Sequence, residues 1–144
     1  MLITNHVLSG ALVGAASPGP ASALGAGVAS HFALDSVPHW GEGVIEDFMH
    51  VAVTDGLVGL AAIAVVAART PRRHRLRVLA GITGACLPDL DKPGRVFFGR
   101  SPFPAAVDAF HVRIQRESSR RMPQEVLVAL TQAAVLAVLA RRSR

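Results

Sequence analysis

One long apolar stretch limits the folds open to this 144-residue chain more than any other feature. It runs from about Ile45 to Ala68 and is followed by Arg69 and a Pro-Arg-Arg turn. A helix of this length is long enough to cross the hydrocarbon core of a bilayer, and a second apolar stretch, 123–140, is similar. The hydrophobic fraction of 51% and the mean hydropathy of +0.40 exceed what a soluble domain needs. We therefore expect a membrane-embedded or membrane-associated protein.

Turn signals divide the rest of the chain into helical pieces. Ala, Leu, Val and Gly dominate and Tyr is absent, a composition that suits close-packed helices better than a β-sandwich. The sequence predicts one all-α domain, a compact bundle of about five helices. Their expected ranges are 5–16, 21–37, 45–68, 76–87 and 123–140, with an irregular basic region over 89–122 that holds an amphipathic helix near 105–117.

Charge is distributed unevenly along this sequence. The formal net charge of +5 comes mainly from arginine clusters at 69–77, 113–121 and 141–144, while residues 1–68 carry five acidic residues and no Lys or Arg. A basic chain can bind nucleic acid, but this one has no helix-turn-helix, zinc-finger or aromatic-plus-basic strand pattern to read bases. We expect no specific nucleic-acid recognition.

The segment from His31 to His39 places His31 and Asp35 four residues apart, on one face of a predicted helix that Pro38 stops. Asp35 would lie in the last turn, where the helix dipole disfavours a carboxylate, so a nearby cation is expected. Since residues 1–68 supply no basic side chain, a bound metal is one candidate; a hydrogen-bonded His–Asp pair is the other. The single cysteine, Cys86, means that His and carboxylates would hold any metal.

Antiparallel packing of consecutive helices would gather the polar residues at one end of the bundle. The opposite end would then receive the arginine clusters at 69–77 and 141–144. Such a separation of acids from bases favours a metal centre. The residues gathered at the polar end are His6, His31, Asp35, Glu46, Asp47, His50, Asp89 and Asp91.

The acidic residues of this group have alternative explanations. Glu46 and Asp47 fall in a first helical turn, which favours acids without any metal, although Glu46 shares a face with His50. Asp55 lies deeper in the apolar helix, so it should accept a hydrogen bond from a ligand histidine or bind an ion. Asp89 and Asp91 suit either a turn or the site.

The order of these motifs resembles the membrane-bound metal-dependent hydrolases. The matching elements are His6 after Thr4-Asn5, the His31 to His39 segment, His50, and Leu87-Pro-Asp-Leu-Asp91. More distantly the chain is similar to the zinc-dependent phospholipase C and single-strand nuclease group, which is all-α. The resemblance implies metal ligation by His31 and Asp35 as the HxxxD pair and by His6 and His50 as single histidines.

The chemistry implied is hydrolysis of a phosphoester or phospholipid-like substrate by a divalent metal that activates water. Zinc is favoured because several ligands are imidazoles, with manganese or iron as alternatives. Additional candidate ligands are His39, Glu46 and His111. Candidate general bases or bridging ligands are Asp55, Asp89 and Asp91, and the candidates for holding a substrate phosphate are Arg113 and Arg116, with Arg120 and Arg121 nearby. These arginines could equally form a solvated or headgroup-facing surface.

A function of a different class stays open. The same His and Asp residues could form a structural metal site or a proton or ion path in a non-catalytic small membrane protein. In either case membrane lipid is an expected partner. The positive-inside rule predicts that the arginine-rich helix ends lie in the cytoplasm, with the metal end facing outward from a cell inner membrane.

Overall fold

The computed structural model describes residues 1–41 and 45–142, and within these ranges the fold is all-helical, without a β-strand. The prediction of an all-α chain is confirmed. The α-helices are α1 (Ile3–Ala16), α2 (Pro20–Asp35), α3 (Met49–Arg69), α4 (Arg72–Cys86), α5 (Asp91–Phe98), α6 (Ala105–Ile114) and α7 (Met122–Arg142). Short 3-10 turns, η1 (Ile45–Phe48), η2 (Leu87–Leu90) and η3 (Ser119–Arg121), precede α3, α5 and α7.

Within the region 89–122, which we expected to be irregular apart from a helix near 105–117, the structure has α6 near the expected helix and also α5, which was not expected. The prolines and glycines of this region mark the helix boundaries instead of preventing helices. Pro93 sits in the first turn of α5, where no backbone N–H is needed. Gly99 ends that helix in the left-handed conformation, with φ of 67°, and Pro104 directly precedes α6.

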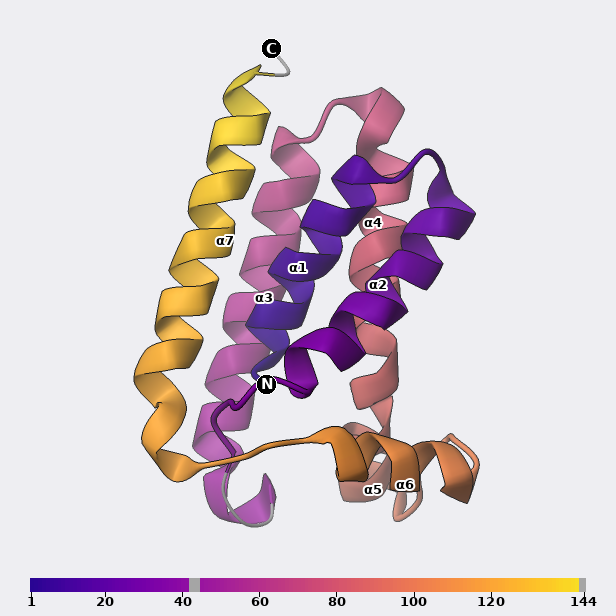
Figure 1. Ribbon diagram of the computed structural model, residues 1–144, viewed down its shortest axis with the longest axis vertical. Helices are drawn as coiled ribbons and strands as arrows, with labels where there is room; N and C mark the ends of the chain where they lie inside the picture. The colour runs from indigo at the N-terminus through magenta and orange to yellow at the C-terminus, as the bar shows by residue number, and fades with distance from the viewer. Residues whose placement is uncertain (42–44, 143–144) are drawn as a thin grey trace.

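Helices α1 to α4 run alternately up and down, as their short connections predict (Figure 1). Helices α5 and α6 lie across the lower end of this bundle in the view of Figure 1, and α7 returns beside α3. The end of α2, the start of α5 and the whole of α6 therefore meet at one end. The arginine-rich turn between α3 and α4 lies at the other end.

Glycines allow α1, α2 and α4 to pack with their backbones in contact. A Cβ atom added at Gly10 would lie 2.6 Å from the carbonyl oxygen of Gly81, and one at Gly14 would lie 2.8 Å from that of Arg77. At Gly84, an added Cβ would collide with the carbonyl oxygen of Leu24 on α2. Any larger residue would force these helices apart, so the three-helix unit has a closely fixed geometry.

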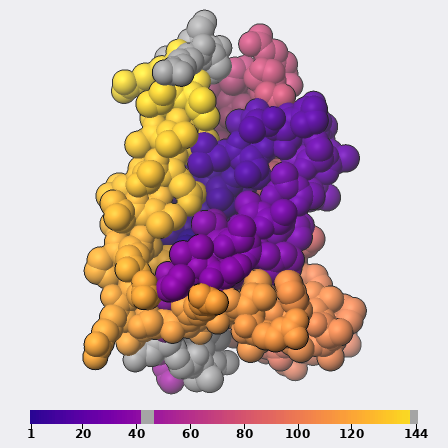
Figure 2. Space-filling model, viewed as in Figure 1, coloured from indigo at the N-terminus to yellow at the C-terminus, as the bar shows by residue number. Residues whose placement is uncertain are grey.

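Two helical segments, α3 and the segment from Ser119 to Arg141 that contains most of α7, are long and apolar enough to cross a membrane by length and composition. Few of their residues are buried, and exposed aliphatic side chains such as Leu57, Leu60 and Leu130 cover them. Figure 2 shows α7 along one edge of the molecule, with α1 visible between it and α2. The buried apolar core is small and lies around Val7 and Ile82.

Candidate metal centre

The HxxxD pair lies at the end of α2 and faces the interior. His31 and Asp35 have no solvent-exposed surface, and the His31 Nε2 atom lies 3.2 Å from Asp35 Oδ2. Helix α2 ends at Asp35 and does not continue to residue 37, so the carboxylate occupies the last helical position before the chain turns toward Pro38. The structure thus brings the two side chains together as their spacing predicts.

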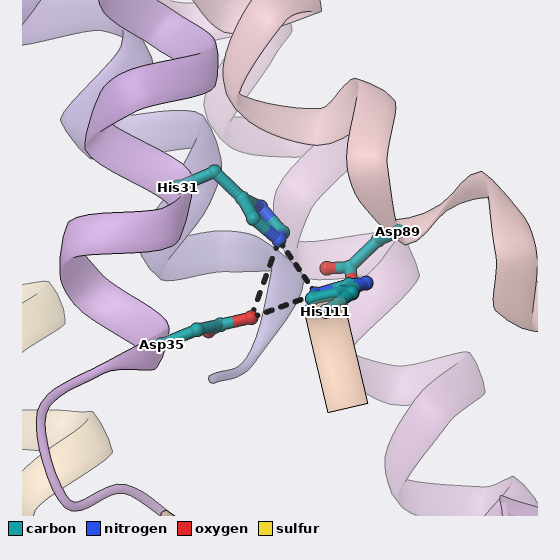
Figure 3. Close-up of side chains that lie close together, drawn as sticks. All are labelled: His31, Asp35, Asp89 and His111. Carbon is teal, nitrogen blue, oxygen red and sulfur yellow. Dashed lines mark hydrogen bonds and ion pairs between the residues drawn. The ribbon is translucent and has the colours of Figure 1, made fainter. Parts of the chain in front are cut away.

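Two residues from distant parts of the chain complete the cluster. His111 comes from α6, and its Nε2 atom lies 3.1 Å from Asp35 Oδ2 and 3.0 Å from His31 Nε2. Asp89 comes from η2, with Oδ1 at 4.0 Å from His111 Nε2. One donor atom from each of the four residues lies within 4.8 Å of the other three, and all four residues are buried. Figure 3 shows the four side chains pointing toward one common point.

The distances and the hydrogen bonding fit a metal ion. His31 Nδ1 lies 2.7 Å from the carbonyl oxygen of Ala85, so this nitrogen must donate, and a neutral ring then keeps a lone pair on Nε2. In a tetrahedral zinc site, bond lengths near 2.0–2.1 Å separate the ligand atoms by about 3.3 Å. The separations of 3.0–3.2 Å among the donor atoms of His31, Asp35 and His111 are close to that spacing.

His6, on α1, contributes a fifth side chain to the cluster. Its Nε2 atom lies 3.2 Å from Asp35 Oδ1 and 3.8 Å from Asp89 Oδ2, and its ring stacks on His31 at 4.0 Å between centroids. His6 is completely buried, yet neither ring nitrogen has a hydrogen-bond partner of good geometry among the described residues. Buried polar atoms are rarely left unpaired, so these nitrogens are suited to a ligand or a proton.

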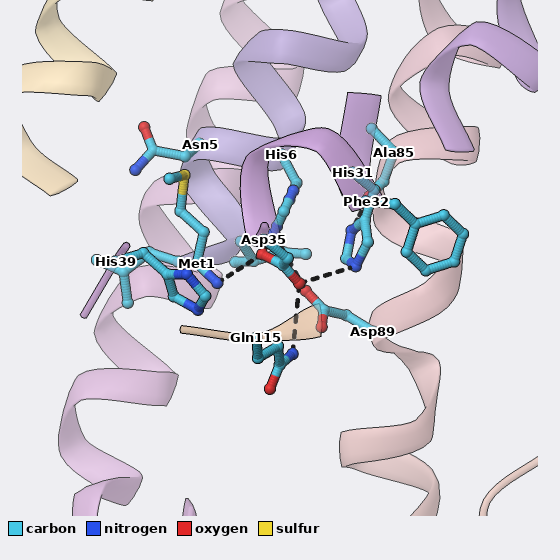
Figure 4. A network of polar contacts seen from close by, with 12 residues as sticks. Met1, Asn5, His6, His31, Phe32, Asp35, His39, Ala85, Asp89 and Gln115 are labelled. Atoms are coloured by element: carbon cyan, nitrogen blue, oxygen red, sulfur yellow. Dashed lines mark hydrogen bonds and ion pairs between the residues drawn. The ribbon is translucent and has the colours of Figure 1, made fainter. Parts of the chain in front are cut away.

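Several neighbours hold the carboxylates in place (Figure 4). The amino group of Met1 lies 2.7 Å from Asp35 Oδ1, and Gln115 Nε2 donates to Asp35 Oδ2 at 3.3 Å. The Lys92 ammonium group lies 2.5 Å from Asp89 Oδ1. Asp91 Oδ2 lies 3.8 Å from His111 Nδ1, where it can orient the imidazole ring. Three carboxylates thus face two cations, and this excess of negative charge suits a divalent cation.

The protonation states also suit metal binding. Burial lowers the pKa of His6, which favours the neutral imidazole. Burial alone would raise the pKa of Asp35, but the imidazoles of His111, His31 and His6, at 3.1, 3.2 and 3.2 Å from its oxygens, outweigh burial and hold that pKa below its usual range. For Asp89, burial is likewise outweighed, mainly by the charge of Lys92, and its pKa falls to about 2. Ionised carboxylates and neutral imidazoles are the forms that bind metals.

Two predicted site residues lie away from the cluster. His50 is exposed at the start of α3, so it is not placed as a ligand. Asp55 accepts backbone hydrogen bonds from Ile3 at 2.6 Å and Thr4 at 3.1 Å, so it caps the N-terminus of α1 and does not face the cluster as a catalytic base.

The other candidates have separate surroundings. His39 is buried, but its Nδ1 donates to the carbonyl oxygen of Val37 at 2.9 Å, and it is not one of the four clustered residues. Arg113 and Arg116 are exposed, and Arg113 lies over the ring of Phe110. The side chain of Glu46 lies outside the described residues.

Sequence analysis missed Gln115, Lys92 and Glu125. Gln115 follows His111 by four residues, a spacing that could have drawn attention to it once His111 was a candidate. Lys92 adjoins the Asp-rich turn and could have been paired with Asp89 in the same way. Glu125 gave no such signal: it is buried and accepts hydrogen bonds from the Asn5 side chain at 2.6 Å and the backbone of Trp40 at 3.0 Å.

Comparison with known protein families, curated proteins and solved structures finds no match for this chain. The resemblance to membrane-bound metal-dependent hydrolases therefore stays a prediction from sequence motifs.

Proposed function

We propose that this protein is a membrane-embedded, metal-dependent hydrolase of phosphoester or phospholipid-like substrates. The observation that carries the proposal is the convergence of two histidines and two aspartates, from α2, η2 and α6, on one buried point. These residues are His31, Asp35, Asp89 and His111. Helices far apart in the sequence rarely direct four potential ligands to one place without a ligand, because burying them is costly.

The set of two imidazoles and two carboxylates suits zinc best, with manganese or iron as alternatives. A divalent ion in this position would activate water and neutralise the charge that develops on a phosphoryl group. With a pKa of about 2, Asp89 is a weak proton acceptor, so we assign it to ligation. The ring nitrogens of His6 are buried beside the cluster without a hydrogen-bond partner among the described residues, so we assign His6 as the general base. Asp91 would position His111.

The substrate's phosphate has candidate partners on the helix that carries His111. Arg113 is part of α6 and Arg116 follows it, and both are exposed and free of local carboxylate contacts among the ion pairs of the described residues. Guanidinium groups bind phosphate through paired hydrogen bonds. A phospholipid headgroup could reach this surface from the membrane that α3 and α7 are proposed to cross, with their arginine-rich ends in the cytoplasm.

The first experiment measures the metal content of detergent-purified protein by plasma mass spectrometry. We expect about one equivalent or more of zinc, manganese or iron in the wild type and its loss in the His31→Ala, Asp35→Ala double variant. The matched control is His50→Ala, Asp47→Ala, which removes the same residue types from exposed positions and should retain the metal. Folded wild-type protein without metal would refute the proposal.

A non-catalytic structural metal site is the second candidate, and the burial of all four donors favours it, since structural zinc sites are closed. The two functions differ in the effect of His6→Gln. If the protein is a hydrolase, this variant should bind metal but lose phosphodiesterase activity at least about 100-fold, the usual contribution of a general base. Metal-loaded wild type that cleaves neither a phosphodiester nor a phospholipid, and that unfolds on chelation, would identify a structural site.

A further inference from the structure

A second site lies on the opposite side of α1 from the metal centre. An apolar groove of about 740 Å³ runs between α1, α3 and α7, and both α3 and α7 pack against α1. Its volume falls within the range of about 300–1,000 Å³ typical of small-molecule sites. It extends along α1 from Thr4 to Ala16, about 18 Å at 1.5 Å per residue. One leaflet of a bilayer core is of similar depth, about 15 Å.

The groove exists because small side chains line the helices that surround it. Ala62 on α3 and Ala133 and Ala137 on α7 face α1 across it, where longer side chains would fill the space. The walls are therefore aliphatic along most of the length and offer no hydrogen-bonding group to an occupant there. An unbranched hydrocarbon chain suits such a groove.

Charge is confined to one end. Arg69, His74 and Arg77 line the groove beside the turn between α3 and α4, and no carboxylate is among its lining residues in the described part of the chain. Arg77 donates from Nη1 to the carbonyl oxygen of Ser17 at 2.9 Å, while its Nε is buried without a hydrogen-bond partner. Two arginines and a histidine at one end of the groove, with no carboxylate among the described lining residues, suit an anion.

We propose that this groove binds one acyl chain of an anionic phospholipid, with the lipid phosphate between Arg69 and Arg77. The phosphate would receive hydrogen bonds from the guanidinium groups of Arg69 and Arg77, and the acyl chain would lie along the alanines. This occupant matches both the apolar walls and the cationic end. A neutral lipid would match only the walls.

The groove is separate from the metal centre. Thr4 and Leu8 line the groove, whereas His6, between them in sequence, points to the other side of α1 and into the His–Asp cluster. The bound lipid is thus a resident ligand and not the substrate of the proposed hydrolase. Metal content and lipid binding can be measured on the same variants, so failure of one proposal is distinguishable from failure of the other.

The test is native mass spectrometry of the full chain titrated with phosphatidylglycerol or phosphatidylcholine of identical acyl chains. We expect tighter binding of phosphatidylglycerol, by about fivefold for each arginine that contacts the phosphate. The Arg69→Gln, Arg77→Gln variant should lose this preference. The control Arg72→Gln, Arg141→Gln removes two exposed arginines that do not line the groove and should keep it.

A second pair of variants tests where the acyl chain lies. Ala133→Phe should fill the groove and reduce binding of both lipids, whereas Ala134→Phe, exposed one residue further along α7, should not. If Ala133→Phe does not fold, Ala62→Phe tests the same wall from α3. Equal binding of the two lipids by the wild type, or an unchanged preference in the Arg69, Arg77 variant, would overturn the proposal. So would a fatty acid binding as tightly as phosphatidylglycerol.

Discussion

The two faces of α1 differ in how they meet the rest of the molecule. On the side of α2 and α4, Gly10 and Gly14 bring the backbones of α1 and α4 into contact, and His6 enters a buried polar cluster. Toward α3 and α7, Leu8 and Ala11 line an apolar groove. Small residues occur on both faces with opposite results. Between touching backbones they allow close packing, whereas between more widely spaced helices they leave space open.

The difference between the two faces matters for function because the His–Asp cluster depends on the tight packing of α1 against α2 and α4. Ala85 on α4 fixes the ring of His31, and α1 delivers His6 to the same point. Small displacements among α1, α2 and α4 would separate the donor atoms. The face toward α3 and α7 carries no such requirement, so it can adapt to a lipid.

The largest expected effect comes from a substitution that prevents the backbones of α2 and α4 from touching. Gly84→Ala should lower the free energy of unfolding by about 3 kcal/mol, because the added methyl group collides with the Leu24 carbonyl oxygen and rigid backbone cannot yield. Thermal unfolding followed by circular dichroism measures this. Gly56→Ala on α3, where an added Cβ meets nothing within 4 Å, should be neutral or stabilise by up to about 1 kcal/mol. Equal melting temperatures for the two variants would show that close packing is not essential.

The next effect concerns the polar contact that joins α7 to α1. Glu125→Ala should cost about 2 kcal/mol, because the backbone N–H groups of Leu2 and Trp40 and the amide of Asn5 lose their buried acceptor. The same unfolding measurement applies, with Gln124→Ala, exposed on the same turn, as the control. A loss no greater than that of the control would mean that α7 is held mainly by apolar contacts.

A pH effect of similar size should appear in chelator-treated protein. The pKa of Asp89 is about 2 when folded and 3.8 ordinarily, so its ionised form stabilises the fold above pH 3.8, and this contribution disappears as the pH falls toward 2. The difference corresponds to about 2 kcal/mol. Melting temperatures between pH 5 and pH 2 should therefore fall less steeply for Asp89→Asn than for wild type. Parallel curves would contradict the assigned ion pair with Lys92.

The smallest effect separates a helix cap from a catalytic group. Asp55→Ala should destabilise the protein by about 1 kcal/mol, the usual cost of losing an N-cap, because Ile3 and Thr4 lose their acceptor. Its metal content and hydrolytic activity, measured after purification at low temperature, should equal those of wild type. If the variant loses its metal while its stability is unchanged, Asp55 belongs to the metal site and is not only a helix cap.

The sequence allowed the helical class and the position of the HxxxD pair to be predicted, since both follow from local periodicity. His31 and Asp35 share a helix face at any tertiary arrangement. Grouping of polar residues at one end also followed, because short connections impose antiparallel packing. The outcome was different for His50 and His111. The sequence placed His50 among the expected ligands and His111 only among the additional candidates, whereas the structure leaves His50 exposed and brings His111 into the cluster.

That reversal has a physical reason. Whether a side chain on a helix faces the centre depends on the rotation of that helix about its axis, which distant packing sets and no local pattern records. Helix α3 has apolar residues on all its sides, so its sequence does not indicate which face is buried. The orientations of His50 and Asp55 could therefore not be predicted from it. Likewise α6 reaches Asp35 only because α5 and α6 cross the end of the bundle.

The sequence by itself determined that this chain is helical, that two of its helices are long and apolar enough to cross a membrane, and that one helix ends in a His–Asp pair. Local propensity, hydrophobic length and i, i+4 spacing suffice for these. Tertiary structure decided which of the candidate residues join that pair, namely Asp89, His111 and His6 but not His50, and that a groove with arginines at one end lies behind α1. Both depend on the rotation and spacing of helices, which arise from contacts between residues distant in the chain.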